Sequence, residues 1–63
     1  MQKPSNTSGQ WLILQWKRKP KRLGTGFGWV PASKPTVFWM TWKAAELLEK
    51  NGLKVRVWPA NVA

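Results

Sequence analysis

The stretch WKAAELLEKNGLKVRVW, residues 42–58, contains the signals for a helix, a helix end and a strand in immediate succession. The apolar residues of AAELL recur at the spacing of one helix face, which predicts a helix over 42–50 with Thr41 as its N-cap. Gly52 follows at the position where a left-handed residue closes a helix. The remaining LKVRVW, at 53–58, alternates apolar and basic residues as a half-buried strand does.

Three further strands are predicted upstream of this helix. Residues 10–17 are rich in large apolar side chains, residues 27–30 form a short candidate, and TVFWM at 36–40 consists of residues that favour strands. The order is therefore strand, strand, strand, helix, strand. We expect a small α+β domain in which an antiparallel sheet of three or four strands carries one helix on one face.

The length of the chain allows one small domain. Its 63 residues include no cysteine and no histidine, which excludes disulfides and the usual zinc sites. Residues 1–9 are polar and predict a flexible N-terminal arm, residues 10–59 form the domain, and 60–63 are a short C-terminal tail. A domain without such cross-links depends on dense aromatic packing, on oligomerisation, or on both.

The strands at 10–17 and 36–40 are apolar on both faces, although one short helix can cover only one face of a sheet. Trp39 and Trp42 flank the predicted junction between strand and helix, so we expect them in the core. The second face should then expose tryptophan, phenylalanine or methionine. Such a surface indicates an interaction site, either for a second copy in a homodimer or for another partner.

The charge balance indicates the kind of partner. Eleven Lys and Arg residues against two Glu give a formal net charge of +9, which predicts attraction to nucleic acid, to an anionic membrane or to an acidic protein. The apolar run WLIL at 11–14 is far shorter than the roughly 20 residues that span a bilayer. Residues 1–9 also lack the apolar segment of a signal peptide. We therefore expect a cytoplasmic protein, nucleoid-associated if bacterial or phage, without a membrane partner.

Two basic segments are the candidate nucleic-acid contacts. KRKPKR at 17–22 is interrupted by Pro20 and followed by glycines, as in a hairpin tip or arm that contacts phosphates. A nuclear-localisation cluster and a solubilising loop are the lesser alternatives. The basic residues of the last strand share one face with an indole that could stack on a base, unless this is an ordinary solvated face. The candidate site consists of Trp16, Lys17, Arg18, Lys19, Lys21, Arg22, Lys54, Arg56 and Trp58.

Catalysis, a cofactor and a bound metal are not expected. The only carboxylates, Glu46 and Glu49, lie on the predicted helix beside lysines and fit surface ion pairs better than an acid–base or metal site. The glycine-rich GTGFG at 24–28 matches neither of the common phosphate-binding glycine motifs, and turn geometry explains it.

The sequence therefore predicts a non-enzymatic, basic DNA-binding protein whose Lys/Arg ribbon, supported by tryptophan, contacts phosphates. Duplex DNA is favoured because the cations are concentrated in a ribbon and an arm. The size and charge fit a small regulator or recombination accessory factor of a mobile element. Two alternatives stay open. One is single-stranded nucleic acid or RNA binding by indole stacking, and the other is an inhibitor or adaptor of an acidic protein surface, such as that of a nucleic-acid enzyme.

Overall fold

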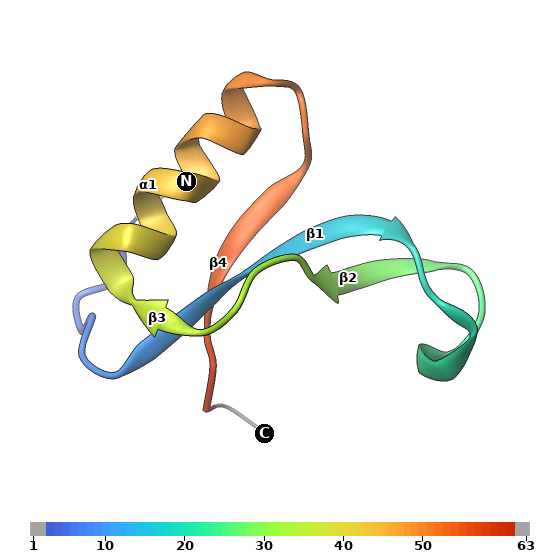
Figure 1. Cartoon of the computed structure of the whole chain (residues 1–63), viewed down its shortest axis with the longest axis horizontal. Helices are drawn as coiled ribbons and strands as arrows, with labels where there is room; N and C mark the ends of the chain where they lie inside the picture. The colour runs from blue at the N-terminus through green and yellow to red at the C-terminus, as the bar shows by residue number, and fades with distance from the viewer. Residues whose placement is uncertain (1–2, 62–63) are drawn as a thin grey trace.

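The computed structural model describes residues 3–61 as a four-stranded antiparallel sheet with one α-helix packed against it (Figure 1). This order and arrangement confirm the predicted fold class. The outermost residues of the predicted arm and tail, 1–2 and 62–63, lie outside the described residues. The elements are β1 (Gln10–Arg18), the 3-10 turn η1 (Lys21–Leu23), β2 (Phe27–Pro31), β3 (Thr36–Val37), α1 (Phe38–Lys50) and β4 (Val55–Pro59).

β1 is the central strand of the sheet. Along one edge it pairs with β4, and along the other it pairs with β3 near its start and with β2 over its second half. In the loop between β2 and β3, the Ser33 hydroxyl accepts a hydrogen bond from the N–H of Ile13 at 2.9 Å, so the edge stays bonded where no strand is present. The hairpin of β1 and β2 extends beyond the helix (Figure 1).

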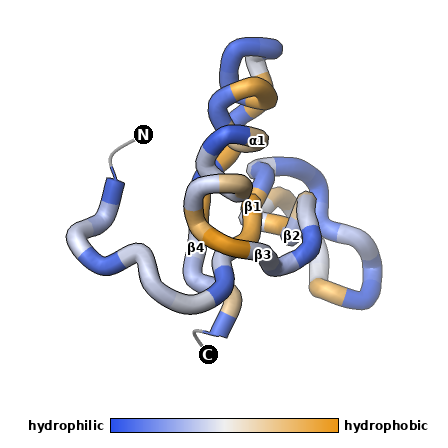
Figure 2. Tube along the Cα trace, turned by 60° about the vertical axis from the view of Figure 1, so that its left-hand side comes forward, coloured by the Kyte–Doolittle hydropathy of each residue, from blue (hydrophilic) through white to orange (hydrophobic). Residues whose placement is uncertain are grey.

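The helix packs on the sheet face that presents the odd-numbered residues of β1. Ile13 is 1% exposed and forms the core with Ala45 of α1 and Val55 of β4, while Leu48 and Val57 pack against this cluster. Hydrophilic and hydrophobic residues alternate along α1, as an amphipathic helix requires (Figure 2). The core is small because α1 contacts β1, β3 and β4 but, among the described residues, makes no contact with β2.

An aromatic cluster completes the packing at the start of the helix. The ring of Phe38 meets Trp11 edge to face with centroids 5.0 Å apart, and it stacks on Trp42 at 5.5 Å. The indole N–H of Trp11 donates to the carbonyl of Ser8 at 3.1 Å, and Nζ of Lys3 lies 5.6 Å from the ring centroid of Trp42. The described part of the N-terminal arm therefore contacts both β1 and α1.

The helix begins earlier than the sequence predicts. A strand over 36–40 is wrong beyond Val37, because Phe38 already belongs to α1. As the first helical residue, Phe38 lies on the same helix face as Ala45 and is buried against Trp11. The same change turns Trp39 outward. Its predicted place in the core is wrong, since 65% of its surface is exposed, whereas Trp42 is half-buried.

Thr41 is a buried helical residue, so its prediction as the N-cap is also wrong. The N-cap is Val37, which provides no side-chain hydrogen bond. The hydroxyl of Thr41 lies 3.1 Å from the carbonyl oxygens of both Trp11 and Val37, and thereby joins the helix to β1.

Replacing Thr41 by valine is expected to lower the free energy of unfolding by about 1 kcal/mol, because the isosteric side chain removes a buried hydrogen bond. Urea denaturation followed by circular dichroism measures the loss. The matched control is Thr36→Val, where the hydroxyl contacts only Sδ of Met40 at 4.0 Å and a change within about 0.5 kcal/mol is expected. Equal losses in both variants would contradict the role of Thr41.

The helix ends where the sequence predicts. Gly52 has a φ of +85°, its N–H donates to the carbonyl of Glu49, and the N–H of Leu53 donates to the carbonyl of Leu48. This is the Schellman arrangement, and it returns the chain toward β4. Within residues 3–61, no helix has the length and apolar composition needed to cross a membrane.

Candidate nucleic-acid interface

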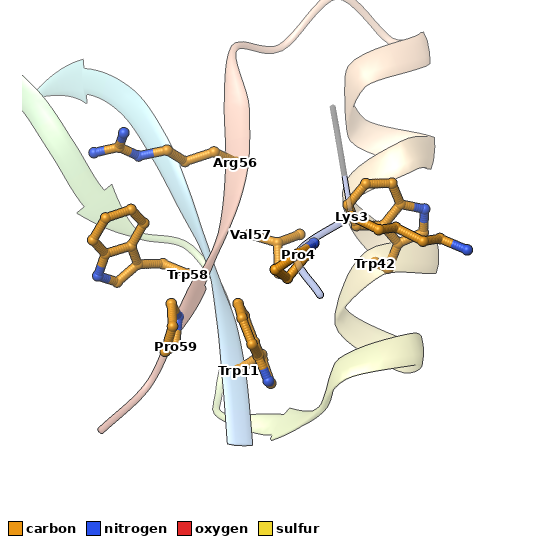
Figure 3. A pocket seen from close by; sticks show the side chains of 8 residues that line it. All are labelled: Lys3, Pro4, Trp11, Trp42, Arg56, Val57, Trp58 and Pro59. Carbon is orange, nitrogen blue, oxygen red and sulfur yellow. The ribbon is translucent and has the colours of Figure 1, made fainter. Parts of the chain in front are cut away.

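The sheet face opposite α1 carries the tryptophans and cations that the helix leaves uncovered. Because side chains alternate along a strand, Arg56 and Trp58 leave β4 on the side away from Val57 and α1 (Figure 3). We call this surface the open face. Its residues are Leu12, Leu14, Trp16 and Arg18 of β1, Phe27, Trp29 and Pro31 of β2, Arg56 and Trp58 of β4, and Lys54 just before β4.

The register of the hairpin brings two indoles together. The N–H of Lys19 donates to the carbonyl of Gly26 at 2.9 Å, which places the hydrogen-bonded pairs of this ladder at odd-numbered residues of β1. Trp16 and Trp29 therefore oppose each other as a non-hydrogen-bonded pair, the type in which side chains approach most closely. Their rings meet edge to face, with centroids 5.5 Å apart and an interplanar angle of 71°.

Arg56 crosses the sheet to join the tryptophans of its two edges. Its register partner on β1 is Leu14, so the side chain must pass over β1 to reach β2. The guanidinium Cζ lies 4.2 Å from the ring centroid of Trp29 and 4.7 Å from that of Trp58. Such contacts between a cation and an indole are attractive, and they hold the guanidinium close to both rings.

The other cations of the open face also lie over aromatic rings. Nζ of Lys54 is 5.4 Å from the ring centroid of Trp16, and Cζ of Arg18 is 5.5 Å from that of Phe27. These side chains stay accessible, since Trp16 is 41% exposed and Phe27 is 58% exposed. The open face is therefore an aromatic surface that carries positive charge along its length.

Two hollows border this surface. A groove of about 430 Å³ is lined by Leu12, Leu14, Trp29, Pro31 and Trp58, together with Lys19, Leu23, Pro59 and Ala60. A second hollow of about 590 Å³ lies along β4 toward α1, where Trp11, Trp42 and Val57 line it and Lys3 and Pro4 of the arm lie against it (Figure 3). The first hollow lies on the open face. The second is lined by Arg56 and Trp58 of the open face and also by the chain's own N-terminal arm.

The predicted site residues fall into two groups. The structure brings Trp16, Arg18, Lys54, Arg56 and Trp58 together on the open face. Of the others, only Lys19 also lines the groove of about 430 Å³ on the open face. Lys17 is exposed but on the opposite side of β1, the side chain of Lys19 lies over Gly28, and Lys21 and Arg22 are exposed in η1.

Sequence reasoning missed the two aromatic residues that β2 contributes to this surface, Phe27 and Trp29. Alternation along FGWVP already places both on one face of their strand. Which face that is depends on the register with β1, in which Trp29 opposes Trp16 and Phe27 opposes Arg18. The sequence therefore indicates that Phe27 and Trp29 share a face of their strand, but not that this face is the one opposite α1.

The open face can stack the flat rings of a ligand on its indoles and can contact anions through its cations. No protein-family model, curated protein or solved structure matches the chain. Within residues 3–61, the acidic side chains form no cluster that could hold a metal ion.

Proposed function

We propose that the protein binds single-stranded DNA on its open face and catalyses no reaction. The observation that carries this proposal is the guanidinium of Arg56 lying between Trp29 and Trp58, with Trp16 packed against Trp29. Unpaired bases stack on such aromatic surfaces with about 1–3 kcal/mol per base. The net charge of +9 attracts the phosphate backbone, and the cations of the open face are placed to contact it.

The shape of the open face favours a single strand over a duplex. In duplex DNA the base planes are stacked on each other, and only base edges and phosphates are accessible in the grooves. The tryptophans lie across three paired strands rather than on one narrow ribbon or helix that could enter a groove. A single strand can turn its bases onto these rings.

The side chains of the open face favour DNA over RNA. A 2′-hydroxyl is both a donor and an acceptor, and it is the group by which proteins distinguish RNA. From Leu12 to Arg18, the open-face side chains of β1 contain no hydrogen-bond acceptor, and the residues opposite them on β2 and β4 add none. The hydroxyl hydrogen of RNA would therefore lose its water partner without gaining a side-chain partner.

Titration of single-stranded and duplex DNA at several salt concentrations tests the proposal. Phosphate contacts from Arg18 and Lys54 predict a log–log salt slope of roughly −1.5 for a single strand, with strong quenching of tryptophan emission. A duplex held by about five cations predicts a slope of roughly −4 to −5, with most emission retained. Tight duplex binding without quenching, together with weak single-strand binding, would contradict the proposal.

Duplex binding through the hairpin is the second candidate. It is favoured by one observation, the exposed Lys17, Lys21 and Arg22 on and beyond a hairpin that extends past the helix (Figure 1). In that case Lys21→Ala with Arg22→Ala would weaken DNA binding strongly, and changes to Trp58 would have little effect.

The positive charge of the open face also disfavours a sheet-to-sheet homodimer, because each copy would place Arg18, Lys54 and Arg56 against like charges.

A further inference from the structure

We infer that the open face selects guanine in a single strand, and that Arg56 is the residue that reads the base. The inference rests on the proposed single-strand binding and adds base identity to it. It follows from the hydrogen-bonding character of the face, from the position of Arg56, and from the groove beside it.

The polar side chains of the open face are all hydrogen-bond donors. They are the indole N–H groups, the guanidinium groups and one ammonium group, and the remaining side chains are apolar. The nearest acceptor on this side of β1 is the carboxamide of Gln10, which lies beyond Leu12 at the first residue of the strand. A surface of donors can satisfy a base edge only where that edge consists of acceptors.

Guanine is the base whose edge fits this requirement. Its N7 and O6 are adjacent acceptors, and two N–H groups of one arginine match them. Adenine places a donor beside its N7, cytosine presents a donor amine, and thymine combines one acceptor with a methyl group. An adenine or cytosine that turned the same edge toward Arg56 would place its amine against the guanidinium donors, which disfavours both bases. The N1–H and the N2 amine of guanine lie on its other edge and can remain in water.

Arg56 is held in a position suited to this contact. Its guanidinium lies 4.2 Å from the Trp29 centroid and 4.7 Å from the Trp58 centroid. Its Nε is buried and, within the described chain, has no hydrogen-bond partner, so the terminal Nη groups are the donors that remain for a ligand. Because an indole is larger than a guanidinium, a base that stacks on the remaining part of Trp58 would meet Arg56 edge to edge.

The groove beside Trp29 and Trp58 provides the space for one base. It measures about 430 Å³. Arg56 is not itself one of its lining residues, but the two rings that contact the guanidinium, Trp29 and Trp58, both line it. The other walls include Leu12, Leu14 and Pro31, which are apolar and suit the flat face of a base. Trp58 remains 40% exposed, so its ring is accessible from solvent.

Short oligonucleotides that differ at one central base test the inference on the native protein. Four oligonucleotides, TTGTT, TTATT, TTCTT and TTTTT, are titrated in lithium buffer, which prevents quadruplex formation. We expect TTGTT to bind on the order of tenfold more tightly than the others. Replacing its guanine by 7-deazaguanine, which keeps the rings but lacks N7, should remove most of this preference.

The other outcomes separate three claims: the guanine preference, the contact with N7, and single-strand binding itself. Equal affinity for all four oligonucleotides would overturn the guanine preference and leave the single-strand proposal standing. A preference that 7-deazaguanine retains would overturn the assigned contact. Absence of binding to any single strand would overturn the inference and the proposed function together.

The variant Arg56→Lys separates base reading from charge. Lysine keeps the positive charge but lacks paired N–H groups in one plane, so we expect similar affinity for all four oligonucleotides. The matched control is Lys54→Ala, which should weaken binding to all four by a similar factor and preserve the guanine preference. Urea denaturation shows whether the Arg56→Lys variant is folded. If it is not, the affinity of the native protein for the 7-deazaguanine oligonucleotide tests the contact instead. Retained selectivity in folded Arg56→Lys would overturn the role of Arg56.

Discussion

Replacing Trp16 and Trp58 together by leucine is expected to weaken single-stranded DNA binding about 100-fold. Each indole offers a stacking surface to one base, and each stacked base contributes roughly 1–3 kcal/mol. Trp16 and Trp58 are 41% and 40% exposed, so a substantial part of each ring is available to a ligand. Leucine keeps an apolar side chain on the sheet while removing the flat ring. Fluorescence anisotropy of a labelled oligonucleotide measures the change in affinity.

Trp39→Leu is the matched control for this double variant. Trp39 is the most exposed of the described tryptophans at 65%, but it lies on α1 rather than on the open face. We expect its replacement to change affinity less than about twofold, because it lies outside the stacking surface. If Trp39→Leu weakened binding as much as the double variant, the site would not be the open face.

Replacing Ile13 by alanine is expected to remove much of the stability of the domain. Ile13 is 1% exposed and packs between Ala45 and Val55, and truncation of such a residue costs about 2–5 kcal/mol. A chain of 63 residues has roughly 3–9 kcal/mol of stability in total. The variant should therefore unfold at much lower urea concentration than the native protein, or be unfolded at room temperature. Near-ultraviolet circular dichroism of the tryptophans reports the loss.

Leu47→Ala provides the comparison on the helix. Leu47 is 57% exposed, and its side chain projects away from the cluster of Ile13 and Ala45. We expect a change within about 0.5 kcal/mol in the free energy of unfolding, since little apolar surface returns to water. A loss comparable to that of Ile13→Ala would mean that α1 packs on the sheet through a different face.

The order of elements could be predicted because its signals are local. The Schellman turn at Gly52 and the alternation of LKVRVW require only neighbouring residues, and both are confirmed in the structure, although β4 itself starts at Val55. The start of the helix could not be predicted in the same way. TVFWM favours a strand by composition, but burial of Phe38 against Trp11 and the hydroxyl bond from Thr41 to Trp11 favour the helix.

The candidate site shows the same division. Alternation places Arg56 and Trp58 on one face of their strand whatever the rest of the chain does, and composition alone establishes the positive charge. Neither property determines which tryptophan rings the side chain of Arg56 contacts. That depends on the register of β2 and β4 on β1, which residues distant in sequence determine through the packing of one face on α1. Trp29 could therefore be assigned to the site only from the paired strands, because the register depends on two segments of the chain at once.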